Sequence, residues 1–213
     1  GPVRWCQPVE ASAIAAARAG PVPVILTPTR TVPPAWLGDL AGARVLCLAS
    51  GGGQQAPLIA AAGARVVSFD ASEEQLAKDA MVARRHDLDV VTVRGDMADL
   101  GCFDDGGFDL VFHPVSNVFV ADVAPVWREC RRVLRPGGRL LAGFMNPDYF
   151  LFDHEDIERG GPLEVRFELP YSDTSHLDPA RLRRRADAGE AIEFSHSLDA
   201  QIGAQIAAGF VIA

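Results

Sequence analysis

The stretch from Arg44 to Pro57 constrains the fold more than any other part of the chain, because it joins a buried strand to a helix through consecutive glycines. Residues 45–49 form an uncharged apolar run, which is typical of a strand covered on both faces. The glycines at 51–53 follow at once, and Pro57 suits the first turn of a helix. A strand, a glycine-rich turn and a helix in this order bring the backbone close to a polar ligand. The sequence therefore predicts a ligand site at this turn.

Further short apolar runs follow, and amphipathic helical segments separate them. With the first run, the predicted strands are 45–49, 65–69, 90–93, 108–113 and 139–144. The predicted helices between them are 57–62, 72–86 and 123–134. A capping box of Ser72 and Gln75 opens the second helix, and Arg135-Pro136-Gly137-Gly138 ends the third. This alternation predicts an α/β fold with a doubly wound, mostly parallel sheet.

Two flanking regions depart from this alternation. Before the sheet, the pattern predicts a helix over 8–19, an extended segment over 22–31 with an ordered loop at 27–30, and a helical turn within 35–40. After it, the alternating residues 163–169 predict a half-exposed strand, 191–195 its partner, and Asp178 the cap of a short arginine-rich helix. The first region is either a lid over a site or packing on the sheet edge, and the second is interpreted as an insertion on the ligand side of the sheet.

The core pattern returns near the end of the chain. It predicts a helix over 198–208, with Leu198, Ile202 and Ile206 on one face, and a strand that begins at Phe210. At 213 residues the chain has the length of a single domain. We therefore expect one domain, divided into an N-terminal region 1–43, a cofactor-binding core 44–145, an inserted segment 146–196 and a return to the core at 197–213.

The net charge of −8 argues against nucleic-acid binding as the function, since binding phosphates needs a basic field. No apolar run approaches the ~18 residues of a membrane span. The cysteines Cys6, Cys47, Cys102 and Cys130 form no C-x-x-C pair, so we expect neither a zinc site nor a disulfide framework. Cys47 is expected to be a small core residue, and the cysteine pattern indicates the reducing cytoplasm.

Gly51 to Ala56 formally match the pattern G-x-G-x-x-A, and Asp70 lies 19 residues after Gly51. In a dinucleotide site the pyrophosphate would rest on the helix N-terminus and Asp70 would hold the ribose. The same pattern suits any adenosine ligand. In the structural alternative the glycines only permit a tight turn and Asp70 is a solvated strand end.

Five segments of the core occur in a recognisable order, and together they are more specific than the glycines alone. They are 45–53 (VLCLASGGG), 66–72 (VVSFDAS), 95–97 (GDM), 108–111 (FDLV) and 134–140 (LRPGGRL). Over Arg44 to Phe144 the chain resembles the class I S-adenosylmethionine-dependent methyltransferases. The resemblance implies a Rossmann-like, seven-stranded type of sheet, S-adenosylmethionine as cofactor and S-adenosylhomocysteine as product.

The same resemblance implies which residues surround the cofactor. Asp70 would bind the ribose hydroxyls, Asp96 would face the adenine amino group and Met97 would pack on the ring. The full implied set is Ala49, Ser50, Gly51, Gly52, Gly53, Gln55, Asp70, Ala71, Gln75, Asp96, Met97 and His113. Two positions depart from the family pattern: Cys47 replaces an acidic residue and Ala49 replaces a glycine. We expect Gln54, Gln55 or backbone carbonyls to substitute for the missing carboxylate.

Methyl transfer from a sulfonium needs orientation and desolvation more than a catalytic side chain. His113, at the end of the fourth strand, is a candidate for a base or a ligand contact, and the alternative is a hydrogen-bonded histidine at a strand end. Tyr149, His154, Tyr171, His176 and His196 line a pocket or are structural. The arginines of 181–185 bind an anionic group or form an exposed helix face.

The sequence thus favours methyl transfer to a small-molecule acceptor, without metal, nucleic acid or membrane. The alternatives are an NAD(P)-dependent oxidoreductase and a non-catalytic subunit that binds an adenosine ligand. The acceptor atom and the oligomeric state stay open. Because members of this family usually end in a hairpin of two strands, we expect the last strand to be missing, and the natural protein to continue beyond Ala213 or residues to be absent from this chain.

Overall fold

The computed structural model describes residues 7–27 and 30–213, which form two compact units. The first unit contains the residues up to 116 together with 128–143, and the second contains 117–127 and 144–213. The expected loop at 27–30 falls partly on residues 28–29, outside the described residues, as does Cys6. The division of one domain into four regions stays a prediction.

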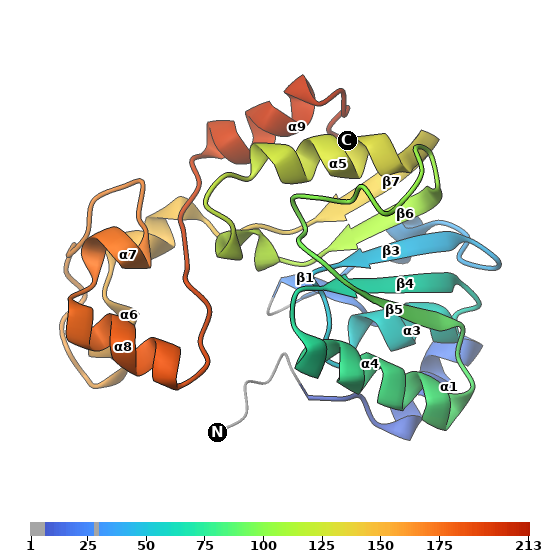
Figure 1. Ribbon diagram of the computed structural model, residues 1–213. Helices are drawn as coiled ribbons and strands as arrows, with labels where there is room; N and C mark the ends of the chain where they lie inside the picture. The colour runs from blue at the N-terminus through green and yellow to red at the C-terminus, as the bar shows by residue number, and fades with distance from the viewer. Residues whose placement is uncertain (1–6, 28–29) are drawn as a thin grey trace. The chain divides into compact units, whose positions relative to one another are not determined.

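Five parallel strands form the sheet of the first unit in the order β5, β4, β3, β6, β7 (Figure 1). They are β3 (Arg44–Leu48), β4 (Arg65–Asp70), β5 (Val90–Arg94), β6 (Phe108–His113) and β7 (Leu134–Ala142). The chain adds β4 and β5 on one side of β3 and then β6 and β7 on the other. The order therefore reverses between β3 and β6, the place where such sheets bind ligands at the carboxyl ends of their strands. The predicted α/β fold is confirmed.

Three helices of the first unit pack on one another and on the strands: α1 (Ala11–Ala19), α3 (Gln55–Ala61) and α4 (Glu73–His86) (Figure 1). Between α1 and β3 lie the short strands β1 (Ile25–Thr27) and β2 (Arg30–Thr31) and the helical turn α2 (Pro34–Leu37). Val24 and Val32 are buried in the same core cluster as Val45 and Ile59. This burial supports packing, rather than a lid, for the N-terminal region.

Two local predictions in this unit are corrected. The Ser72 side chain does accept a hydrogen bond from the Gln75 amide, but the Ser72 amide donates to Asp70 Oδ1 instead of to Gln75, so only half of the capping box forms. The Pro-Gly-Gly segment does not separate a helix from a strand starting at Arg139. β7 begins directly after α5 (Ala124–Val133), and the segment forms a bulge within it, because Phe108 pairs with Leu134 and Leu110 with Arg139.

The second unit consists of short elements. They are η3 (Pro147–Leu151), α6 (His154–Glu158), α7 (Asp173–His176), α8 (Pro179–Asp187), η4 (Asp199–Gly203) and α9 (Ala204–Ala207), while η2 (Ser116–Phe119) lies at the boundary of the two units. Asp178 caps α8 by accepting from the amides of Ala180 and Arg181, as predicted. The predicted pair of strands at 163–169 and 191–195 is wrong. Each segment forms only an isolated bridge, Val165 with Phe152 and Phe194 with Ser172, because each finds a different partner.

The C-terminal segment also differs from the prediction. Its helix divides into the π-helical η4 and the α-helical α9, and its apolar side chains Leu198, Ile202 and Ile206 are exposed. The buried face carries Gln201, whose amide donates to Asn117 Oδ1, so polar contacts rather than the apolar stripe set the orientation of the helix. Residues 210–213 form no strand.

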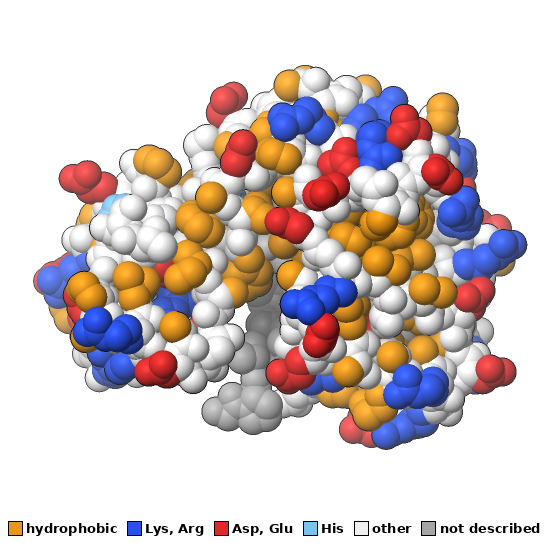
Figure 2. All heavy atoms as spheres, in the orientation of Figure 1, with side chains coloured by type: hydrophobic (Ala, Val, Ile, Leu, Met, Phe, Trp, Pro, Cys, Tyr) orange, Lys and Arg blue, Asp and Glu red, His pale blue; other side chains and the backbone are white. Residues whose placement is uncertain are grey.

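Charged side chains of both signs are interspersed on the face drawn in Figure 2, so the net charge of −8 is not gathered in a single patch on that face. Within 7–27 and 30–213, no helix has the length and apolar character needed to cross a membrane.

Candidate functional site

The turn after β3 has a backbone that largely requires glycine. Gly52 and Gly53 have φ of 132° and 80°, and a Cβ on Gly53 would lie 2.9 Å from Pro8 Cα. Ala49 has φ of 48° although it is not glycine, a conformation that L residues adopt at a cost. Ala49 is held there because its amide donates to Phe69 O (2.7 Å) and its carbonyl accepts from Ser116 Oγ (2.5 Å).

Two carboxylates accept hydrogen bonds from the amides of this turn. Asp70, at the end of β4, accepts from the Gly51 amide through Oδ2 at 3.0 Å. Asp79, on α4, accepts from the Gly53 amide through Oδ1 at 2.6 Å and from Ser68 Oγ through Oδ2 at 2.5 Å. The donors that would receive a bound anion are therefore directed at carboxylates of the protein itself.

Asp79 is completely buried, and sequence reasoning missed it. Burial raises the pKa of its carboxyl to about 6, and the charge of Asp70 adds to the effect, while hydrogen bonds from Ser68, Gly53 and Gly52 oppose it. A signal was present in the sequence: Asp79 lies three residues after Leu76 and four before Ala83, on the buried face of the predicted helix.

The ends of β4 and β5 meet beside the turn. The Gly95 amide donates to the Asp70 carbonyl (3.1 Å), and a Cβ on Gly95 would lie 2.2 Å from Phe69 Cζ. The next residues are the exposed Asp96, whose Oδ1 accepts from the Ala98 amide at 2.9 Å, and the half-buried Met97. The structure therefore brings the first three predicted motifs to one edge of the sheet.

The glutamines expected to replace the missing carboxylate of the first motif are engaged elsewhere. Gln55 is buried and its Oε1 accepts from the Ile25 amide at 3.1 Å, while Gln54 Nε2 donates to the Gln7 carbonyl at 2.7 Å. Cys47 is buried as predicted, and burial raises the pKa of its thiol, with a further contribution from the charge of Asp79. The carboxylate whose charge acts on Cys47 is therefore that of Asp79, on α4.

The remaining residues of the predicted set surround the same turn. Gln75 packs against Gly51, since a Cβ there would lie 2.8 Å from Gln75 Cβ, and its Oε1 accepts from Lys78 Nζ at 3.3 Å. Ser50 is buried, and the exposed Ala71 offers its carbonyl to Arg94 Nε at 3.2 Å.

His113 connects the two strands at the switch point. It is completely buried at the end of β6, and its Nδ1 lies 2.9 Å from the carbonyl oxygen of Leu48 at the end of β3. Burial lowers the pKa of His113 to about 4, so the imidazole is neutral near pH 7. This geometry agrees with a histidine hydrogen-bonded at a strand end. The next residue but one, Val115, has φ of 42°, a strained conformation for a β-branched residue.

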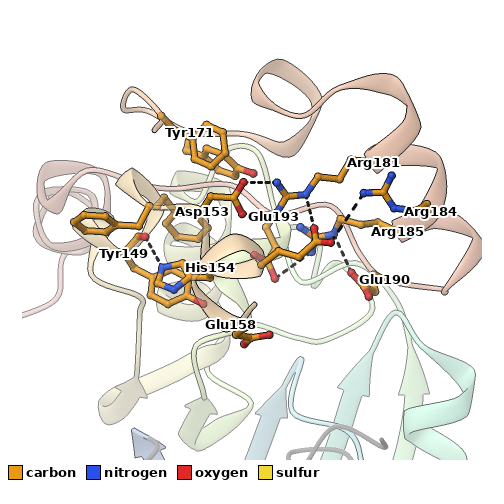
Figure 3. Close-up of a pocket in the computed structure, with 14 residues that line it drawn as sticks. Tyr149, Asp153, His154, Glu158, Tyr171, Arg181, Arg184, Arg185, Glu190 and Glu193 are labelled. Atoms are coloured by element: carbon orange, nitrogen blue, oxygen red, sulfur yellow. Dashed lines mark hydrogen bonds and ion pairs between the residues drawn. The ribbon is translucent and has the colours of Figure 1, made fainter. Parts of the chain in front are cut away.

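The second unit contains a pocket of about 430 Å³ (Figure 3). Its walls combine aromatic and charged side chains: Tyr149, Phe150, Phe152, Asp153, His154, Glu155, Glu158, Phe167, Tyr171, Arg181, Arg184, Arg185, Glu190 and Glu193. His154 stacks on Tyr149 with ring centroids 3.6 Å apart, and its Nε2 lies 2.8 Å from the Tyr149 carbonyl. Tyr149, His154 and Tyr171 therefore line this pocket, as one of the two sequence alternatives expected.

The arginines of α8 divide into two kinds. Arg181 forms ion pairs with Asp153 (2.6 Å) and Glu155 (2.6 Å), and Arg185 does so with Asp173 (3.1 Å) and Glu190 (3.0 Å). Arg183 and Arg184 are exposed. The expectation of an exposed face thus holds for only part of the run, because two of the guanidinium groups are engaged by carboxylates of the protein.

His176 and His196 are not among the residues that line this pocket. His176 stacks on Tyr171 and its Nδ1 lies 3.0 Å from the Ser172 carbonyl, while the buried His196 places Nε2 3.0 Å from the Asn117 carbonyl. Among the described residues, no group of three or more His, Cys, Asp or Glu side chains is arranged to hold a metal ion.

Comparison with known proteins agrees with this geometry. Residues 46–142 match the family model described as a methyltransferase domain. An uncharacterized methyltransferase of Bacillus subtilis is 47% identical over 208 residues, which are 98% of this chain and 81% of that protein. The chain belongs to the S-adenosylmethionine-dependent methyltransferase family. The resemblance predicted from the five motifs is confirmed.

Other members of the methyltransferase family are more distant. A demethylmenaquinone methyltransferase of Clavibacter sepedonicus is 40% identical over 146 residues, 67% of this chain and 54% of that protein. The crystal structure of an S-adenosylmethionine-dependent methyltransferase from Mesorhizobium loti aligns with a TM-score of 0.63 and 22% identity over 84% of this chain and 79% of that one. The latter shows that the fold is shared.

Proposed function

We propose that this methyltransferase binds S-adenosylmethionine at the turn after β3 and transfers the methyl group to a small-molecule acceptor. The observation that carries the proposal is the pair of carboxylates beneath the turn. Asp70 and Asp79 occupy the glycine amides and give this edge of the sheet a negative character. S-adenosylmethionine carries a positively charged sulfonium and ammonium group, so its charge is complementary.

The residues present fit this cofactor. Each oxygen of the Asp70 carboxylate accepts one backbone amide and retains a lone pair for a ribose hydroxyl. The exposed Asp96 would accept from the adenine amino group, and the half-buried Met97 offers an apolar surface to the ring. When bound, the cofactor supplies an activated methyl group, and the protein contributes orientation and exclusion of water.

The alternative dinucleotide site receives no support from these contacts. A pyrophosphate bound at a helix N-terminus needs amides that point at it and a field that favours negative charge. Here the amides of Gly51 and Gly53 point at two carboxylates. An oxidoreductase function is therefore not favoured.

We propose further that the pocket of the second unit binds the acceptor. Its aromatic side chains suit a flat apolar group. Its wall has five carboxylates, Asp153, Glu155, Glu158, Glu190 and Glu193, against three guanidinium groups. Arg181 and Arg185 are paired with carboxylates of the same wall, and two carboxylates remain in excess, so the pocket favours a neutral or amine-bearing aromatic acceptor over an anionic one.

Calorimetry with S-adenosylmethionine, S-adenosylhomocysteine and NAD⁺ tests the cofactor. We expect micromolar binding of the first two and none of the third, and the absence of binding by S-adenosylmethionine would refute the proposal. Transfer of labelled methyl to matched aromatic compounds, such as tyramine and 4-hydroxyphenylacetate, tests the acceptor class. Methylation of acids in preference to amines and neutral phenols would contradict the assignment of the pocket.

A further inference from the structure

The burial of Asp79 costs free energy because its side chain is a carboxylate, and its contacts within the protein do not require a charge. Its carboxylate is completely buried, and no Lys or Arg of the described residues forms an ion pair with it. Burying a charge without a partner is unfavourable. The Gly52 amide also donates to this carboxylate. The two shortest contacts, to the Gly53 amide and to Ser68 Oγ, are ones that a neutral asparagine would also satisfy, with Oδ1 accepting from the amide and Nδ2 donating to the hydroxyl. A charge kept at a site despite its cost points to function.

The position of this charge indicates what the function is. Asp79 binds the last glycine of the turn and Asp70 binds the first, so the two carboxylates hold the turn at both ends. Gly53 lies two residues before the start of α3, and the contact of its amide with Asp79 holds the backbone at φ of 80°. The negative charge thus lies immediately beneath the backbone on which the cofactor is proposed to rest.

We propose that ionised Asp79 is a positioning residue for the cofactor, which holds the glycine turn and supplies a buried negative charge that attracts the cationic S-adenosylmethionine. The proposal rests on the proposed cofactor site. It predicts that the affinity for the cofactor depends on the ionisation of this single buried group.

The surroundings of Asp79 allow this ionisation to be observed. The charged group that faces it is Asp70 on β4, and the thiol of Cys47 faces it from β3. Burial raises the pKa of the thiol, so Cys47 stays protonated near pH 7. α3 contributes no titratable side chain. Since the pKa of Asp79 is raised to about 6, its charge is present at pH 8 and largely lost at pH 5.

The test is calorimetric titration of S-adenosylmethionine into wild type, Asp79→Asn and Glu74→Gln between pH 5 and 8. Glu74→Gln is the matched control because it also removes one negative charge from α4, from a side chain that is 77% exposed. We expect wild type to lose roughly tenfold in affinity from pH 8 to pH 5, the size for a unit charge acting over a distance on the order of 10 Å through protein. Asp79→Asn should bind roughly tenfold more weakly at pH 8 without this pH dependence, and Glu74→Gln should follow wild type.

S-adenosylhomocysteine, which lacks the sulfonium charge, should lose less affinity than S-adenosylmethionine in Asp79→Asn, whereas a distorted turn would weaken both equally. Thermal unfolding of the variant shows whether it is folded. Two results would overturn the role of Asp79 and leave the proposed cofactor site standing. One is equal affinity of wild type and Asp79→Asn for S-adenosylmethionine at pH 8, and the other is an equal loss of affinity for S-adenosylmethionine and S-adenosylhomocysteine in the variant. Failure of wild type to bind at any pH would overturn the cofactor site and this proposal together.

Discussion

Replacing Asp79 by asparagine should make the protein more stable at neutral pH, although the residue is completely buried and makes two strong hydrogen bonds. The pKa of the carboxyl rises from its ordinary 3.8 to about 6 in the folded protein. The folded state therefore binds the proton more tightly than the unfolded chain, and wild type loses stability as pH rises from about 4 through about 6. The difference between the two pKa values corresponds to roughly 3 kcal/mol at pH 8.

An asparagine approximates the protonated carboxyl and does not incur this loss. We expect the free energy of unfolding of Asp79→Asn to exceed that of wild type by about 1.5 kcal/mol at pH 5 and about 3 kcal/mol at pH 8. His113, whose burial lowers its pKa to about 4, destabilises both proteins as pH falls below about 6.5, so its contribution cancels in the difference.

Urea unfolding followed by circular dichroism across this pH range measures the effect. Because Asp79 belongs to the unit that contains the sheet, the transition of that unit is the one to compare. A variant that is less stable than wild type at pH 8, or a difference that does not change with pH, would show that the ionised carboxylate is not a net cost. The buried charge of Asp79 would then not indicate a functional role.

Three further substitutions test the packing and the backbone. Arg185→Ala should lower the free energy of unfolding of the second unit by about 3 kcal/mol, because it leaves the buried Asp173 without its cation, whereas the exposed Arg183→Ala should change it by less than about 0.5 kcal/mol in the same urea titration. Gly95→Ala should cost about 1–3 kcal/mol, since the new Cβ would overlap the Phe69 ring, and unchanged thermal stability would contradict this contact. Ala49→Gly should raise the free energy of unfolding by up to about 1 kcal/mol, and with it the melting temperature, because it relieves a positive φ. A melting temperature below that of wild type would show that no strain is stored at this residue.

The sequence predicted the parallel sheet and the cofactor-site motifs because both depend on local patterns. An uncharged apolar run such as 45–48 is stable as a strand only when both of its faces are buried. Strands that alternate with helices can form only a few sheet topologies. The carboxyl ends of parallel strands meet at one edge, so the order of strands alone predicts that Gly51, Asp70 and Asp96 lie together. Their roles in binding are proposals that the measurements above address.

The predictions failed where a segment depends on a distant partner. Residues 163–169 alternate as a strand should, yet they form only a bridge through Val165, since no neighbouring strand pairs with the rest of the segment. Leu198, Ile202 and Ile206 have helical spacing, but the contacts of Gln201 turn the opposite face inward. Local pattern defines which face is apolar, and tertiary packing decides which face is buried.

Asp79 shows the division most clearly. The sequence by itself determined a helix that begins at Ser72 and a glycine turn that begins at Gly51, because capping and glycine conformations are local properties. Only the tertiary structure placed the carboxylate of Asp79 2.6 Å from the Gly53 amide, 26 residues away in the chain. The helical spacing from Leu76 and Ala83 indicates a buried face, but the neighbouring charge of Asp70 and the hydrogen bonds that set the ionisation of Asp79 come only from the tertiary structure.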